Sequence, residues 1–138
     1  MQKKFLLADD DSDDSELFCE AVNEIDGSIV CYLAADGGEV LEKLEDKTFD
    51  VPDVIFLDIN MPEVNGWECL KALKSQPAYR RVPVIIYSTS SAERDIQKAY
   101  DLGAAYFLTK PDNYNVLKRF IGQVVQNIRG NLSEILKG

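Results

Sequence analysis

Val54-Ile55-Phe56-Leu57-Asp58 carries the clearest indication of the fold, because four consecutive apolar residues end at a carboxylate. An unbroken apolar run of this length is typical of a strand that helices cover on both faces of a parallel sheet. Similar runs lie at residues 5–8, 29–33, 84–87 and 106–108. These runs predict the five strands of one parallel sheet.

The segments between these runs have apolar residues at helical spacing, which predicts a helix after each strand. Successive segments carry Leu17, Phe18, Ala21, Val22 and Ile25; Val40, Leu41 and Leu44; Trp67, Leu70 and Leu73; Ile96 and Ala99; and Val116, Leu117, Phe120, Ile121, Val124, Val125 and Ile128. Each set is expected to face the core. The alternation predicts an α/β fold, a doubly wound five-stranded parallel sheet of (βα)5 type in a single domain.

Capping signals give approximate helix boundaries. The candidate caps are Ser12 or Asp13, then Asp36, then Ser90 with Glu93 in a capping box, and finally Asp112 or Asn113. Gly103 is expected to end the fourth helix. We expect the domain to span residues 1–129 and a C-terminal tail, too short for an output domain, to span residues 130–138 after the break at Gly130.

The composition excludes several function classes. The 138 residues are 46% hydrophobic and 28% charged, a composition that is ordinary for a soluble globular protein. The net charge of −9 argues against nucleic acid or an anionic membrane as partner. The charge instead fits a basic protein surface or a divalent cation. The sequence has no histidine, so Ser-His triads and histidine metal sites are excluded.

The cysteines and the N-terminus indicate a cytoplasmic protein. Cys19, Cys31 and Cys69 form no Cys-x-x-Cys pair, and we expect them to be small buried residues in a reducing compartment. The apolar run at residues 5–8 is too short for a signal peptide or a membrane span.

Polar side chains follow four of the predicted strands. Asp9-Asp10-Asp11 comes after the first strand, Asp58 after the third, Ser88 after the fourth, and Lys110 with Pro111 after the fifth. In a doubly wound sheet, ligands bind beyond the carboxyl ends of the strands. We therefore expect these groups to form one site.

Carboxylates held close together repel one another, and a divalent cation with oxygen ligands offsets that repulsion. Mg²⁺ suits such a site because it keeps coordination positions for water and phosphate oxygens. Asp58 would then be a nucleophile that attacks phosphorus, while Lys110 and Ser88 would stabilise the equatorial oxygens.

At this point the chain resembles the receiver domain of bacterial response regulators, the CheY-like family with its flavodoxin-like fold. The matching segments are Ala8-Asp9-Asp10-Asp11, Phe56-Leu57-Asp58-Ile59-Asn60-Met61-Pro62 with Gly66, Pro83-Val84-Ile85-Ile86-Tyr87-Ser88, and Phe107-Leu108-Thr109-Lys110-Pro111. The resemblance covers about residues 4–128.

The resemblance implies a role for each matching residue. Asp58 looks like the phospho-acceptor, and Asp9, Asp10, Asp58 and the backbone carbonyl of Asn60 look like the Mg²⁺ ligands. Ser88 and Lys110 look like the groups that bind the phosphoryl oxygens.

Two further expectations concern the switch. Phe107 stands at the position of the aromatic residue that swings inward when the hydroxyl moves, and the bond between Lys110 and Pro111 is expected to be cis. Asn60 and Ser90 stand at positions that affect the lifetime of the phosphoryl group.

The resulting hypothesis is a stand-alone response regulator, not an enzyme beyond its own phosphorylation and dephosphorylation. Its partners would be a sensor histidine kinase or a histidine phosphotransfer protein and a downstream protein target, with a homodimer formed on phosphorylation as in relatives. Three features look similar to the subgroup paired with phytochrome-type and other hybrid kinases: the triple-acidic start with Asp13-Asp14, the Trp67-Glu68 pair and the Ser88-Thr89-Ser90-Ser91 run.

Three alternatives are weighed against it. A phosphatase of the haloacid dehalogenase class would need an acid where Asn60 stands. An unphosphorylated receiver-like binding module would usually have lost an acidic, hydroxyl or lysine group. A flavodoxin-like cofactor binder would need a phosphate loop after the first strand.

Overall fold

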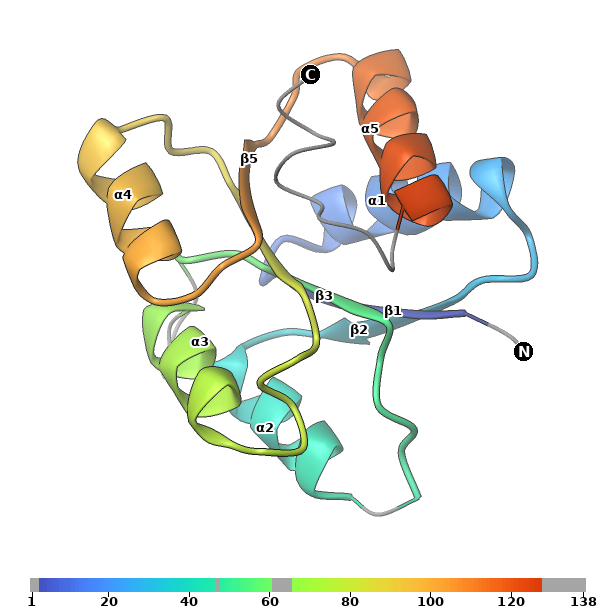
Figure 1. The fold of residues 1–138 in the computed structure, drawn as a ribbon. Helices are drawn as coiled ribbons and strands as arrows, with labels where there is room; N and C mark the ends of the chain where they lie inside the picture. Colours follow the sequence, from blue (N-terminus) through green and yellow to red (C-terminus); the bar gives the residue numbers. More distant parts are fainter. Residues whose placement is uncertain (1–2, 47, 61–65, 128–138) are drawn as a thin grey trace.

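The computed structural model describes residues 3–46, 48–60 and 66–127. Met61, Pro62, Ile128 and the predicted boundary between residues 129 and 130 lie outside this range, so the domain division stays a prediction. Within it, the predicted alternation of strands and helices is confirmed (Figure 1). The strands are β1 (Lys4–Ala8), β2 (Val30–Ala34), β3 (Val54–Leu57), β4 (Val84–Ser88) and β5 (Tyr106–Thr109), and the helices are α1 (Ser12–Ile25), α2 (Gly37–Glu45), α3 (Gly66–Ser75), α4 (Glu93–Asp101) and α5 (Tyr114–Asn127).

The five strands form one parallel sheet in the order β2-β1-β3-β4-β5. Figure 1 shows α1 and α5 on one face of the sheet and α2, α3 and α4 on the other. Because successive side chains of a strand point to opposite faces, each strand contributes to two cores. Phe56 packs toward α1 and α5, whereas its neighbours Ile55 and Leu57 pack toward α2, α3 and α4.

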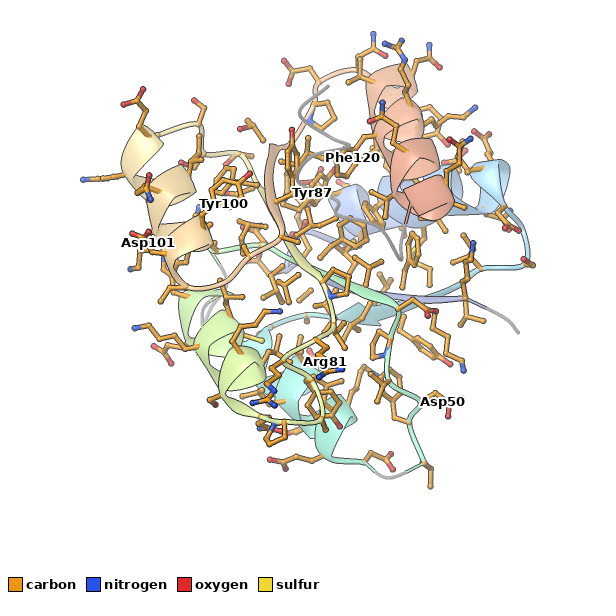
Figure 2. The ribbon with its side chains drawn as sticks, in the orientation of Figure 1. Asp50, Arg81, Tyr87, Tyr100, Asp101 and Phe120 are labelled. Carbon is orange, nitrogen blue, oxygen red and sulfur yellow. A yellow bond between two sulfur atoms is a disulfide. The ribbon has the colours of Figure 1, made fainter. Side chains whose placement is uncertain are left out.

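The core under α1 and α5 is aromatic. The Phe56 ring centroid lies 4.7 Å from that of Phe18 and 5.6 Å from that of Phe5. Tyr87 and Phe120 belong to the same layer (Figure 2). This packing holds α1 against the sheet.

The strand order reverses between β1 and β3, because β2 lies on one side of β1 and β3 on the other. Backbone hydrogen bonds continue past the strand ends: the amide of Asp9 donates to Ala34 at 3.0 Å and that of Asp58 donates to Ala8 at 2.9 Å. Two carboxylates are thus fixed at the position where ligands bind in this type of sheet.

Three helix starts can be compared with their predicted caps. Asp36 is confirmed, because its side chain accepts the Glu39 amide. The prediction of Ser12 or Asp13 is wrong: Asp11 caps α1 by accepting the amides of Asp13 and Asp14. Asn113 caps the last helix, since its side chain accepts the Asn115 amide at 2.8 Å.

The predicted capping box at Ser90 is wrong. Ala92 is the N-cap of α4, without a side-chain hydrogen bond, and the helix begins at Glu93. The Ser90 hydroxyl instead donates to Asp95 at 2.6 Å and accepts the Ala92 amide at 3.2 Å. The predicted end of α4 is confirmed, because Gly103 has a φ of 100°.

Some predicted core residues are exposed. Leu17 and Ile25 of α1 and Val116 of α5 are exposed, although they continue the apolar spacing of their helices. A helix that covers a sheet buries only a stripe, and these three residues lie at its margin. In β2 only Ala34 is buried, because this strand is at the edge of the sheet.

The expectation of three free buried cysteines is wrong for two of them. Cys19 of α1 and Cys31 of β2 are half-buried and form a disulfide, with Cα atoms 6.0 Å apart. This separation lies within the range that disulfides require. Cys69 is free and buried, and burial raises the pKa of its thiol to about 12.

The predicted cis bond before Pro111 is also wrong, because the Lys110–Pro111 peptide bond is trans. The trans isomer is the lower-energy state of a bond to proline by about 0.5–1 kcal/mol.

Across the residues that the structure describes, no helix combines the length and apolar character needed to cross a membrane.

Candidate functional site

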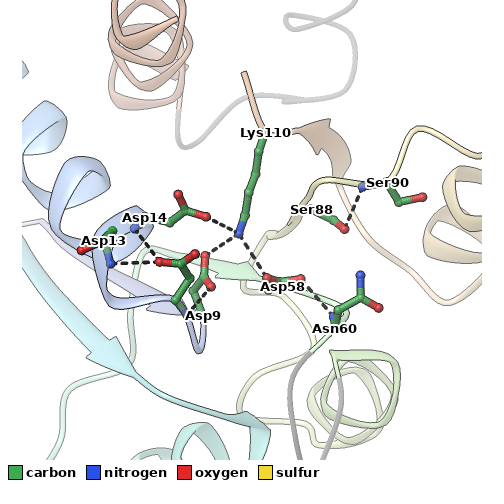
Figure 3. A network of polar contacts seen from close by, with 9 residues as sticks. Asp9, Asp13, Asp14, Asp58, Asn60, Ser88, Ser90 and Lys110 are labelled. Atoms are coloured by element: carbon green, nitrogen blue, oxygen red, sulfur yellow. Dashed lines mark hydrogen bonds and ion pairs between the residues drawn. The ribbon is translucent and has the colours of Figure 1, made fainter. Parts of the chain in front are cut away.

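Side chains from three strand ends and one helix meet at the carboxyl edge of the sheet. Asp9 follows β1, Asp58 follows β3 and Lys110 follows β5, while Asp14 comes from the first turn of α1 (Figure 3). Asp9 and Asp58 are buried and Asp10 is exposed. The predicted convergence of the acidic groups and the lysine is therefore confirmed.

The three carboxylates of Asp9, Asp10 and Asp58 form a candidate cation site. One oxygen of each lies within 4.8 Å of the others. Buried carboxylates at this spacing repel one another, and a cation with oxygen ligands offsets the repulsion. The donor set therefore fits a divalent cation.

Lys110 is held by three carboxylates. Its Nζ lies 2.7 Å from Oδ2 of Asp9, 2.9 Å from Oδ2 of Asp14 and 3.2 Å from Oδ2 of Asp58 (Figure 3). The side chain of Lys110 is only 9% exposed. An ammonium group has three donors, so these contacts use all of them.

Burial and nearby charges shift the pKa values of Lys110 and Asp9 in opposite directions. Burial lowers the pKa of the Lys110 ammonium, but the hydrogen bonds and charges of the carboxylates outweigh it, so the pKa is raised. Burial raises the pKa of the Asp9 carboxyl, against the effects of Lys110 and the Asp11 amide. Lys110 therefore stays charged at neutral pH, in contact with the carboxylates of Asp9, Asp14 and Asp58.

The hydroxyl of Ser88 lies at the end of β4, on the other side of Asp58 from Asp9 (Figure 3). Ser88 is fully buried, and its Oγ accepts the amide of Ser90 at 3.2 Å. The Lys110 amide donates to the Ser88 carbonyl at 2.7 Å, which fixes the ends of β4 and β5 together. Ser88 and Lys110 thus approach the edge beside Asp58 from neighbouring strands.

The backbone after Asp58 is closely packed. The Asn60 amide donates to Oδ1 of Asp58 at 3.0 Å, and the side chain of Asn60 is exposed. A Cβ atom on Gly66 would lie 2.4 Å from the Asp58 carbonyl oxygen. Only a glycine allows α3 to begin this close to the backbone that follows β3. The role of the Asn60 carbonyl as a cation ligand stays a prediction.

Phe107 is buried in the core between the sheet and α4, with 7% of its surface exposed. The side chain of Phe107 therefore already lies inward in this structure. Its role as a switch aromatic stays a prediction.

Two side chains at the site were missed by the sequence reasoning. Asp14 is an acid in the first turn of α1, and its carboxylate contacts Lys110. Tyr87 was assigned only to a strand, yet the Lys110 Nζ lies 5.4 Å from the centroid of its ring. A signal for Asp14 was present, because it precedes the buried Phe18 by four residues and so lies on the inner face of α1.

The arrangement combines a group of carboxylates that fits a cation, a buried ammonium and a buried hydroxyl. These groups are the ones that phosphoryl transfer requires, because its catalysis consists mainly of positioning and charge stabilisation.

Comparison with known proteins agrees with this chemistry. The family model described as "Response regulator receiver domain" matches residues 5–121. The chain is 34% identical over 127 residues to the probable transcriptional regulator ycf29 of Pyropia yezoensis, covering 91% of this chain but 54% of that protein. It is 30% identical over 125 residues to the response regulator Rcp1 of Synechocystis sp., covering 86% of this chain and 84% of Rcp1.

Solved structures show the same likeness. The phosphorylated cyanobacterial phytochrome response regulator RcpA superimposes with a TM-score of 0.84 at 32% identity, covering 91% of this chain and 93% of that one. The Mn²⁺-bound form of Rcp1 superimposes with a TM-score of 0.75 at 29% identity, covering 88% and 91%. From the matched family model, the strand-end residues and these structures together, we conclude that the chain belongs to the response regulator receiver domain family.

Proposed function

We propose that this protein accepts a phosphoryl group on Asp58 from a phosphohistidine of a sensor histidine kinase or a histidine phosphotransfer protein. The observation that carries the proposal is the contact of the buried Lys110 ammonium with Asp58 and Asp9 at the switch point of the sheet. This places a positive charge beside a carboxylate that fits the role of nucleophile.

The reaction is a group transfer without a change of oxidation state. An Asp58 carboxylate oxygen attacks phosphorus, the O–P bond of an acyl phosphate forms, and the N–P bond of the phosphohistidine breaks with its electron pair left on the imidazole nitrogen. Lys110 stabilises the charge on the phosphoryl oxygens, and the Ser88 hydroxyl donates to one of them.

Mg²⁺ is the proposed cation. Asp9, Asp10 and Asp58 would hold it together with the Asn60 carbonyl, and the ion would neutralise charge on the phosphoryl oxygens. The carboxylate geometry supports a divalent cation, and a relative of known structure binds Mn²⁺. The preference for Mg²⁺ rests on its affinity for oxygen ligands and phosphates.

The signalling role follows from the likeness to Rcp1 and RcpA. We propose that the protein acts in a phytochrome-type or related histidine kinase system and signals by contact with a protein target. Its only catalysis would be its own phosphorylation and dephosphorylation, and a homodimer formed on phosphorylation and a cytoplasmic location stay predictions.

The binding-module and phosphatase alternatives are less well supported. A receiver-like module that is not phosphorylated has no need of Asp58, Ser88 and Lys110 at one edge. A phosphatase would need a general acid two residues after the nucleophile, where Asn60 stands.

Intact mass spectrometry after incubation with acetyl phosphate tests the proposal. Wild-type protein is expected to gain one phosphoryl group in the presence of Mg²⁺ and none in the presence of EDTA. Asp58→Asn is expected to gain none, while Asp13→Asn, a change at an exposed acid outside the cation site, retains the adduct.

A Mg²⁺-dependent adduct on Asp58→Asn would show that another residue is the acceptor. No adduct on the wild type with either acetyl phosphate or a purified phosphohistidine donor would favour the unphosphorylated binding module.

A further inference from the structure

We propose that Asp14 is a positioning residue for Lys110, which it holds so that one donor of the ammonium points at Asp58. The inference rests on the proposed function, because the purpose of this placement is phosphoryl transfer. It goes beyond the cation site, since the group of cation-binding carboxylates is Asp9, Asp10 and Asp58 and does not include Asp14.

The three N–H bonds of the Lys110 ammonium point to three corners of a tetrahedron. Asp9 and Asp14 accept two of them at 2.7 and 2.9 Å, and Asp58 accepts the third at a longer 3.2 Å. Two fixed donors determine the direction of the third. When a phosphoryl group is transferred to Asp58, that third donor is the one free to bond a phosphoryl oxygen.

The position of Asp14 supports this role. Figure 3 shows Asp14 and Asp58 approaching the Lys110 nitrogen from different sides, Asp14 from α1 and Asp58 from β3. The amide of Asp14 donates to the side chain of Asp11, so the first turn of α1 is fixed. Without Asp14, Lys110 would keep only the contact with Asp9 and the longer contact with Asp58.

Asp14 also lies where its loss can be tolerated. Its side chain is 36% exposed and lines a small cleft with Tyr87, Lys110 and Pro111. A residue whose only task was to fill the core would be buried. The ion pair between the partly exposed Asp14 and Lys110, whose side chain is 9% exposed, instead indicates a role at the site.

Asp13 provides a matched control. It is the preceding residue in the first turn, its amide also donates to Asp11, and it is exposed. Among the interactions that the structure shows for the described residues, its side chain makes no contact with Lys110. Asp13→Ala and Asp14→Ala thus remove the same charge from the same helix turn, and only the second removes a contact of Lys110.

The first measurement is the rate of phosphorylation by acetyl phosphate and Mg²⁺. Asp14→Ala is expected to react about three- to tenfold more slowly than Asp13→Ala, because a misplaced charge-stabilising group costs rate even when it is still present. In a Lys110→Gln background the two alanine variants are expected to react equally, because Asp14 acts through Lys110. An equal or faster rate for Asp14→Ala than for Asp13→Ala in the wild-type background would overturn the proposal.

The second measurement needs no phosphorylation. An ammonium held by carboxylates exchanges its protons slowly, so its ¹⁵N–¹H signal can be observed, and Lys110→Gln assigns it. We expect the Lys110 signal in the wild type and Asp13→Ala and its loss or broadening in Asp14→Ala. An unchanged signal in Asp14→Ala would overturn the proposal, whereas a wild type that shows the signal but accepts no phosphoryl group would overturn only the function proposed above.

Discussion

Gly66 is the first residue of α3 and lies against the backbone that follows β3. A Cβ atom there would lie 2.4 Å from the Asp58 carbonyl oxygen and 2.7 Å from the Ile59 Cα, and neither backbone atom can move like a flexible side chain. We expect Gly66→Ala to lower the free energy of unfolding by about 2 kcal/mol, as in other overpacked sites. We also expect slower phosphorylation, because the displaced backbone carries Asp58. Chemical denaturation and the acetyl phosphate assay measure the two effects.

Gly122→Ala is the matched control. A Cβ on this α5 residue would meet only the Cδ1 atom of Ile25 at 3.8 Å, which is ordinary contact. Alanine has the higher helix propensity, so the free energy of unfolding should rise by about 0.5–1 kcal/mol. If Gly66→Ala were as stable as Gly122→Ala, the close approach of α3 to Asp58 would be wrong.

At the same scale, Asp9, Asp58 and Lys110 could be predicted from sequence because each lies just after an apolar run, Asp9 and Asp58 directly and Lys110 after Thr109. The carboxyl ends of parallel strands share one edge, so a strand-end position is also a position in space. Asp14 could not be assigned in the same way. An acid in the first turn of a helix favours the helix dipole whether or not it contacts a lysine, and only the packing of α1 on the sheet separates the two roles.

Among the elements, α1 and β2 are joined by a covalent link. The disulfide between Cys19 and Cys31 spans a sequence separation of 12. Closing a loop of this length removes conformations from the unfolded chain and contributes about 3 kcal/mol to stability. Reduction by dithiothreitol is therefore expected to lower the free energy of unfolding by about that amount, measured by urea denaturation.

The third cysteine gives an internal control for this experiment. Native reduced protein is expected to take up two alkyl groups from iodoacetamide at pH 8, because the thiol of Cys69 is fully buried and has a pKa of about 12. The stability of Cys19→Ser should not respond to dithiothreitol. If the wild type responded no more than Cys19→Ser, the contribution of the disulfide to stability would be refuted.

Element types were easier to predict than element ends. Strands such as β3 consist of apolar residues that are buried on both faces of the sheet, so an unbroken apolar run identifies them. Helix starts depend on which of several small polar side chains accepts the free amides. In the segment before α4, the Ser90 hydroxyl donates to Asp95 and accepts the Ala92 amide, and the helix begins two residues later than its capping pattern indicates.

For the molecule as a whole, negative charge is the main electrostatic feature. The net charge is −9, and two buried and one exposed carboxylate face one another at the cation site. Lys110 neutralises part of this local charge. A divalent cation that binds only the folded chain would remove more of the repulsion and stabilise the fold by mass action.

Thermal unfolding measures this effect. At free Mg²⁺ about 100-fold above the dissociation constant, the free energy of unfolding should rise by about 2.7 kcal/mol, which increases Tm by about 10 °C for a domain of this size. NaCl at the same ionic strength screens charges without occupying the site, so it should raise Tm less. Asp10→Asn should lose most of the Mg²⁺-specific increase, whereas Asp13→Asn, also at an exposed acid but outside the cation site, should keep it. Equal Tm increases in the two variants would show that Mg²⁺ acts through the overall charge of the molecule and not by binding at the strand ends.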